Sequence, residues 1–177
     1  MTDPYQERYE SHQARKREVL TELLAERHSE RRFADENVPD DDLAHLIDAA
    51  ERSASSCNRH GVYMSVVTDR DTKALLGGLL VGGVGWIHRA PAVVMLFADP
   101  LAYKAGDEIT YMPYLDAGVM VGHLYLAAAA RGLAGCFVNP NVRESHKDLF
   151  RARFGHDLYC GAYAVGPPRP DAEPWPA

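Results

Sequence analysis

The sequence predicts one domain in which helices and β-strands are mixed. Apolar residues recur at helical spacing in several segments, and between these segments lie short runs of β-branched and aromatic residues bounded by turn residues. The chain has 177 residues, and neither an internal repeat nor a linker divides it. We therefore expect residues 1–177 to form a single domain with its own core.

The first half of the chain predicts helix, helix, strand and helix. Residues 5–26 form the first helix, and its beginning, residues 1–18, is almost wholly polar. Three acids after Pro39 mark the start of the second helix, where negative side chains interact favourably with the unpaired backbone N–H groups. This role accounts for the three acids, so we expect no metal site there. The remaining elements of this half are a loop at 53–61, a strand at 62–67 and a helix at 71–80.

The second half predicts two buried elements. Residues 92–97 form a continuous apolar run and are expected to be a strand buried on both faces. Residues 109–131 form a helix that is apolar nearly all round, which predicts burial, and its Asp116 and His123 need partners inside the fold. The rest follows as a strand at 133–138, a helix at 142–154 with Leu149 and Phe154 inward, a strand at 158–165, and an extended, proline-rich tail at 167–177.

Composition narrows the class of protein. A formal net charge of -6 and a pI near 5.7 argue against binding to nucleic acid or to an anionic membrane, and no apolar run reaches membrane-spanning length. The three cysteines are widely spaced and form no C-x-x-C pair, which indicates neither a zinc ribbon nor a redox dithiol. Their odd number fits a reducing compartment, so we expect a cytoplasmic protein.

Two polar stretches are candidate ligand sites. Residues 27–33 gather three arginines, His28 and Ser29, and guanidinium groups match the oxygens of a phosphate. In an acidic protein such a local cationic group indicates a small anionic ligand, although an ion-paired helix end is the alternative. The loop at 53–61 is dense in small hydrogen-bonding residues, and it is either a ligand loop or a helix cap with a turn.

Several segments together resemble the nitroreductase family of flavin mononucleotide (FMN) enzymes. Residues 27–33 resemble the R-x-S-x-R-x-F signature of that family, and residues 55–58 resemble its S-S-x-N loop. Three further segments match in order, namely Arg89-Ala90-Pro91, the long helix that runs into Gly132-Leu133-Ala134-Gly135-Cys136, and Ala164-Val165-Gly166-Pro167. The resemblance covers residues 20–168.

The resemblance implies an α+β fold, a nitroreductase-like α/β sandwich with a central, mainly antiparallel sheet flanked by helices. It also implies an intertwined homodimer with FMN at the subunit interface. By position, the resemblance implies that Arg27, Ser29 and Arg31 bind the flavin phosphate, that His28 contacts the ribityl chain, and that Arg169 adds a further phosphate contact. It implies that Ser55, Ser56 and Asn58 contact the flavin of the opposite subunit. The backbone N–H groups of Gly135 and Cys136 are expected near the N5 edge of the ring.

The implied activity is reduction of nitro or quinone acceptors by NAD(P)H, with ping-pong hydride transfer through flavin N5 and no assigned catalytic side chain. His60-Gly61-Val62 stands where the family often has Q-P-W. His60 is therefore either a contact to the flavin or substrate or a solvated loop residue. Because of this departure, a second possible function is that of an FMN-dependent dehydrogenase or oxidase of a biosynthetic intermediate. The third alternative is a non-catalytic flavin-binding dimer.

Overall fold

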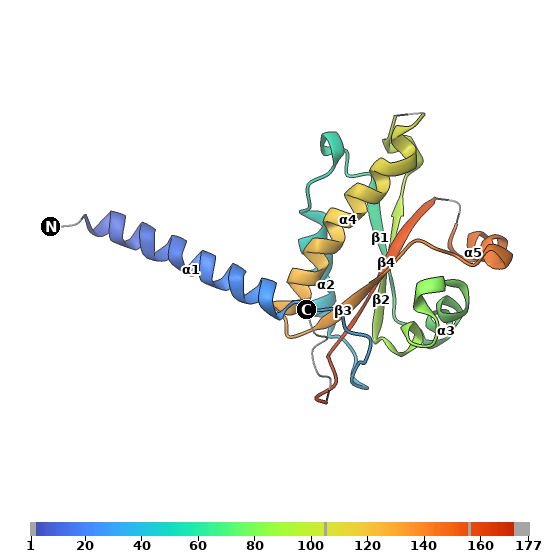
Figure 1. Cartoon of the computed structure of the whole chain (residues 1–177), viewed down its shortest axis with the longest axis horizontal. Coiled ribbons are helices and arrows are strands. Elements are labelled where there is room, and N and C mark those ends of the chain that lie inside the picture. The colour runs from blue at the N-terminus through green and yellow to red at the C-terminus, as the bar shows by residue number, and fades with distance from the viewer. Residues whose placement is uncertain (1–2, 105, 156, 172–177) are drawn as a thin grey trace.

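The computed structural model describes residues 3–104, 106–155 and 157–171, and it arranges them in three layers (Figure 1). A four-stranded sheet lies in the middle, with α2 and α4 on one face and α3 and α5 on the other. The α-helices are α1 (Pro4–Glu26), α2 (Asp40–Glu51), α3 (Arg70–Leu79), α4 (Glu108–Ala129) and α5 (Lys147–Phe154). The strands are β1 (Val62–Val67), β2 (Ala92–Ala98), β3 (Ala134–Val138) and β4 (Leu158–Gly166).

The sheet has the strand order β1-β2-β4-β3, and every pair of neighbouring strands is antiparallel. All of β2 is buried, because its side chains alternate between two apolar clusters. Val94 and Leu96 face the cluster under α2 and α4, while Val93 and Met95 face the cluster on the α3 side. The predicted α+β fold with a mainly antiparallel sheet is confirmed, as is the two-sided burial of the central strand.

Acidic residues lie at the starts of two helices, although no side chain caps α2. The first turn of α2 holds Asp40, Asp41 and Asp42, directly after Pro39. At the start of α3, the carboxylate of Asp69 accepts a hydrogen bond from the Thr72 N–H at 2.9 Å.

Helix α4 is covered on only one side by its own chain. Its buried side chains pack on α2 and the sheet, and His123 Nδ1 donates to the Ala49 carbonyl of α2 at 2.9 Å, so His123 has the interior partner that we expected. However, Leu115 is 58% exposed and Val119 is 45% exposed. The prediction that this helix is buried all round is therefore wrong for a single chain.

Helix α1 projects away from the three layers, as Figure 1 shows, and it has no buried residue. Val19, Leu20 and Leu24 on this helix are exposed in the single chain. Within the described residues, no helix combines the length and apolar content that crossing a bilayer requires.

Two predictions near the C-terminus need correction or lie outside the described residues. The helix at 142–154 is shorter than predicted, because α5 begins at Lys147 after a 3-10 turn at Glu144–His146. Leu149, predicted to face inward, is 49% exposed, and its neighbour Phe150 is buried instead. The tail pairs with the segment after α1 through Phe33 and Pro168, while its predicted course over 172–177 lies outside the described residues.

Candidate functional site

The segment after α1 leaves the helix and runs along the outer edge of β3. Arg27 has extended backbone angles and ends the helix. Ser29 pairs with Gly135 in a parallel bridge, and the Glu30 N–H donates to the Gly135 carbonyl at 2.9 Å. Because side chains alternate along an extended chain, Arg27, Ser29 and Arg31 share the exposed side, while Glu30 points inward. We call Arg27, Ser29 and Arg31 the arginine cluster.

Glu30 fixes the backbone of this segment from the buried side. Its buried carboxylate accepts the N–H groups of Arg31 and Arg32 through Oε1, at 2.8 and 2.7 Å. His28 Nε2 lies 3.7 Å from Glu30 Oε2, and His28 Nδ1 donates to the Glu26 carbonyl at 2.9 Å. The half-buried imidazole is thus held between the end of α1 and Glu30.

The guanidinium groups of Arg27 and Arg31 rest on aromatic rings. Arg27 Cζ lies 5.3 Å from the centroid of Tyr125, and Arg31 Cζ lies 5.7 Å from that of Trp86. In the described parts of the chain, neither group forms an ion pair with a carboxylate. The ion-paired alternative applies to Arg32, whose Nε lies 3.9 Å from Glu30 Oε1. The arginine cluster therefore keeps two charges available for an anion.

The Ser29 hydroxyl is oriented by a chain of hydrogen bonds from β3. The Phe137 N–H donates to the Tyr125 hydroxyl at 2.9 Å, and that hydroxyl lies 3.1 Å from Ser29 Oγ. Either hydroxyl can donate in this contact, because the Tyr125 oxygen keeps a second lone pair after it accepts the Phe137 N–H. The contact places the Ser29 hydroxyl on the exposed side, where it can also bind a ligand group.

Gly135 lies directly over a buried hydroxyl. A Cβ at this position would lie 2.6 Å from the Tyr163 hydroxyl oxygen and 2.4 Å from the Ala164 carbonyl oxygen, so only glycine fits. The Tyr163 hydroxyl finds no hydrogen-bond partner among the described residues, and burial raises its pKa. It therefore stays protonated beneath the strand that Ser29 contacts. Cys136 follows in the same strand and is also buried.

The second candidate segment, residues 55–60, is a loop with an unusual backbone. Cys57, Asn58 and His60 have φ values of 51°, 54° and 49°, in the left-handed region that costs a residue other than glycine about 1–3 kcal/mol. Inside the loop, the His60 N–H donates to Ser55 Oγ at 2.9 Å, and His60 Nε2 lies 3.0 Å from Asn58 Oδ1. We call residues 55–60 the left-handed loop. Such strain is typical of functional segments.

The left-handed loop is attached to the first half of α4. The Ser56 N–H donates to Asp116 Oδ1 at 2.8 Å, and Arg59 Nη1 donates to Glu108 Oε1 at 2.6 Å. This hydrogen bond from Arg59 is the main reason that the pKa of Glu108 lies below its usual value. Asp116 thus has an interior partner, as the sequence required.

The structure brings the predicted residues together in two groups rather than one. The arginine cluster and Gly135 meet at Tyr125, near the C-terminal end of α4, while the left-handed loop meets α4 at Asp116. At about 1.5 Å per residue, these two attachment points lie about 14 Å apart along the helix. Arg169 belongs near the first group, since its N–H donates to the Arg32 carbonyl at 3.2 Å, but its guanidinium is paired with Asp171.

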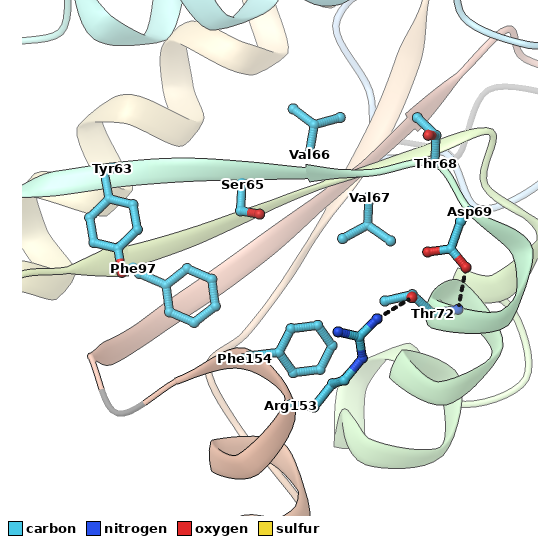
Figure 2. Close-up of a pocket in the computed structure, with 10 residues that line it drawn as sticks. All are labelled: Tyr63, Ser65, Val66, Val67, Thr68, Asp69, Thr72, Phe97, Arg153 and Phe154. Carbon is cyan, nitrogen blue, oxygen red and sulfur yellow. Dashed lines mark hydrogen bonds between the residues drawn. The ribbon is translucent and has the colours of Figure 1, made fainter.

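A separate groove of about 440 Å³ lies against β1, away from both groups (Figure 2). Arg153 Nη2 donates to Thr72 Oγ1 across it at 3.1 Å, and Asp69 caps α3 at its end. The groove is lined by Tyr63, Ser65, Val66, Val67, Thr68, Asp69, Thr72, Phe97, Arg153 and Phe154, so none of the predicted site residues borders it. The groove is therefore separate from the candidate site.

The sequence model of the nitroreductase family matches residues 24–84 and 79–166, which together span most of the chain. This chain belongs to the nitroreductase family. The match includes the arginine cluster, the left-handed loop and β3, whereas Arg169 lies beyond it.

Individual relatives agree with the nitroreductase assignment. The FMN reductase (NAD(P)H) of Bacillus subtilis strain 168 is 29% identical over 130 residues, which are 66% of this chain and 51% of that protein. This nitroreductase-family chain therefore spans about half the length of that curated relative.

Solved structures share the nitroreductase fold at lower identity. The nitroreductase family protein of Streptococcus pneumoniae TIGR4 has a TM-score of 0.76 at 19% identity and covers 89% of this chain and 94% of its own. A protein from Desulfovibrio desulfuricans, described as a nitroreductase and solved in complex with FMN, has a TM-score of 0.74 at 22% identity, covering 90% and 91%. At these identities the likeness shows the fold.

Two residues of this candidate site were not predicted from the sequence. Tyr125 carries the hydrogen-bond chain to Ser29, and Glu30 shapes the backbone of the arginine cluster. The signal for Tyr125 was present, because a hydroxyl inside an otherwise apolar helix needs a partner as much as Asp116 and His123 do. Glu30 gave no such signal, since a glutamate among arginines is usually a surface ion pair.

Proposed function

We propose that this chain is an FMN-dependent oxidoreductase that takes electrons from NAD(P)H and passes them to a small acceptor of the nitro or quinone type. The observation that carries this proposal is the arginine cluster, whose two guanidinium groups have no ion-pair partner in the described chain. Membership of the nitroreductase family supports it, as do the FMN named for the Bacillus subtilis relative and the FMN bound to the Desulfovibrio desulfuricans protein.

In this proposal Arg27 and Arg31 hold the phosphate of FMN, and the Ser29 hydroxyl adds a hydrogen bond. The aromatic rings under both guanidiniums restrict their motion, so less side-chain entropy is lost on binding. His28 lies beside this cluster and contacts the ribityl chain. Arg169 adds a phosphate contact only after it releases Asp171, whose carboxylate it binds through two nitrogens.

We infer that two copies of the chain form a homodimer through α4. Its exposed side carries Tyr111, Leu115, Gly118, Val119 and Gly122, and a Cβ built on either glycine has no atom within 4 Å. An apolar helix face with small residues lets a second helix approach closely, and a two-fold axis perpendicular to the helix makes the pair antiparallel. The exposed apolar side chains of α1 suggest that this helix also lies on the partner.

The antiparallel pairing explains why the site residues fall into two groups. The glycines lie midway between Asp116 and Tyr125, so a two-fold axis near them brings the left-handed loop of one chain opposite the arginine cluster of the other. Ser55, Ser56, Asn58 and His60 then contact the flavin held by the opposite chain.

The chain itself supplies binding and orientation. FMN, when bound, supplies the two-electron chemistry. In this proposal the backbone at Gly135 and Cys136 lies at its N5 edge. The Gly135 N–H is the donor there, because the polar groups of Gly135 and Phe137 point to the outer edge of β3, whereas the Cys136 N–H points towards β4. We also propose a cytoplasmic location, which suits three free thiols.

The absorption spectrum of the freshly purified protein, followed by anaerobic addition of NADH or NADPH, tests this function. We expect a flavin spectrum that bleaches with at least one nucleotide and recovers when a quinone or nitroaromatic acceptor is added. A bound flavin that neither nucleotide reduces would instead favour the oxidation of a biosynthetic intermediate, and a protein that takes up no FMN would overturn the proposal.

Replacing Arg27 by alanine tests the phosphate site. Loss of one charge-assisted contact, worth roughly 1.5–3 kcal/mol, should weaken FMN binding at least about tenfold in a flavin fluorescence titration. Arg151→Ala, which removes an exposed arginine of α5, is the matched control and should bind FMN as the unaltered protein does. Equal affinity in the Arg27 variant would remove this assignment.

A further inference from the structure

The left-handed loop does not hold its conformation by itself. Cys57, Asn58 and His60 all occupy the left-handed region, which an unconstrained chain avoids at residues other than glycine and, to a lesser degree, asparagine. Bonds within the loop, such as the His60 N–H to Ser55 Oγ, close a turn but do not fix its place on the protein. The bond that joins the loop backbone to the core runs from the Ser56 N–H to Asp116.

Asp116 is well suited to anchor that backbone. Its side chain is in the interior, with the residue 7% exposed, and each carboxylate oxygen accepts one hydrogen bond: Oδ1 from the Ser56 N–H at 2.8 Å and Oδ2 from the Tyr103 hydroxyl at 2.9 Å. Burial, followed by the hydrogen bond to Asp116, raises the pKa of Tyr103, so its hydroxyl remains a donor. The carboxylate is therefore held from two sides.

Gly61 makes room for this arrangement. A Cβ at residue 61 would lie 2.7 Å from Ala102 Cβ and 2.7 Å from Tyr103 Cε2, so any side chain there displaces the Tyr103 ring. The Gly61 carbonyl also accepts the Asp99 N–H at 2.9 Å, which fixes the loop end beside Tyr103. The glycine that departs from the sequence pattern of the family is thus the residue that admits Tyr103 to Asp116.

We propose that Asp116, supported by Tyr103 and by the space at Gly61, is a positioning residue that sets the conformation of residues 55–60. Through it, α4 presents Asn58 and His60 at the surface where the partner chain docks. The anchoring depends only on contacts within one chain. Its consequence for FMN binding rests on the proposed function.

Hydrogen exchange at the amides of residues 56–60, measured by NMR or mass spectrometry without FMN, tests the anchoring. Asp116→Ala removes the acceptor of the Ser56 N–H, so we expect exchange in the loop to accelerate at least about tenfold. Asp116→Asn keeps an amide oxygen for that N–H and should restore slow exchange. Gly61→Ala leaves Asp116 intact but pushes Tyr103 away, and it should also accelerate exchange.

Phe150→Ala is the control for general destabilisation, because Phe150 packs on the other face of the sheet. It should lower the melting temperature without changing loop exchange. If Asp116→Ala does not fold, Tyr103→Phe removes the hydroxyl alone and should accelerate loop exchange by a smaller factor. The anchoring would be overturned if loop exchange stays slow in Gly61→Ala and also in the folded variant at the anchor. That variant is Asp116→Ala, or Tyr103→Phe if Asp116→Ala does not fold.

FMN titration of the same variants separates the two claims. Faster exchange with an FMN dissociation constant raised at least tenfold in Asp116→Ala, and rescued in Asp116→Asn, is the expected result. Faster exchange with unchanged FMN affinity would overturn the role of the loop in cofactor binding. If the unaltered protein binds no FMN, the proposed function fails, and the exchange result alone decides the anchoring.

Discussion

At the residue scale, Gly135 is a position with no room for a side chain. Gly135→Ala places a methyl group against the Ala164 carbonyl and the Tyr163 ring, so we expect the free energy of unfolding to fall by about 1–3 kcal/mol. Gly78→Ala, in an open position of α3, should instead raise it by about 0.4–1 kcal/mol. Urea unfolding measures both, and an unchanged midpoint for Gly135→Ala would contradict the packing described for β3.

Cys160 gives a prediction about alkaline pH. Burial, followed by the nearby charge of Asp116, raises the pKa of the Cys160 thiol to about 12. Because the folded pKa lies above the unfolded one, this group contributes stability below about pH 9 and loses that contribution as pH rises towards 12.

Comparison with Cys160→Ala isolates this contribution. The free energy of unfolding of the unaltered protein should fall more steeply between pH 9 and 11 than that of Cys160→Ala, measured by urea unfolding at each pH. Cys57→Ala, which removes an exposed thiol, is the control and should keep the slope of the unaltered protein. Parallel slopes for all three proteins would rule out the proposed linkage.

At the element scale, the exposed side of α4 carries the dimer proposal. Val119→Arg puts a charge on that side, so we expect a folded monomer by sedimentation velocity, with unchanged far-ultraviolet circular dichroism and lost FMN binding. Leu149→Arg changes a similarly exposed leucine on α5 and should leave the dimer intact. A dimer that survives Val119→Arg would place the interface elsewhere.

The elements themselves were largely predictable, and the errors have one cause. Hydrophobic periodicity and capping residues located the helices and strands, including the acids that begin α2 and the two-sided burial of β2. Periodicity alone could not decide whether Leu149 or Phe150, which are neighbours on a short helix, faces the core. In the structure Phe150 packs against the sheet. Nor could it say that one side of α4 has no neighbour in its own chain.

At the scale of the whole molecule, the proposed site belongs to two chains. Arg27→Ala and Asn58→Ala should each abolish tight FMN binding when present in both copies. When the two variants are mixed and allowed to exchange subunits, each mixed dimer regains one intact site, which restores about a quarter of the sites. Flavin titration before and after subunit exchange measures this. No recovery in proven mixed dimers would show that each chain builds its site alone.

The two halves of the candidate site could be predicted from sequence, but their relation could not. Arg27, Ser29 and Arg31 were recognisable because guanidiniums and a hydroxyl suit a phosphate, and Ser55 to Asn58 because they resemble a family loop. Their separation depends on which residues of α4 they contact, and a linear pattern does not show that Ser29 contacts Tyr125 or that Ser56 contacts Asp116.

The stacking of Arg31 on Trp86 gives the arginine cluster its own fluorophore. The indole N–H is held by the Gly82 carbonyl at 2.9 Å, so the ring is fixed while the guanidinium above it can respond to an anion. Inorganic phosphate, which is colourless, can then be titrated by indole emission once Trp175, the second tryptophan of the chain, has been replaced. Occupancy of the cluster thereby becomes measurable without a flavin signal.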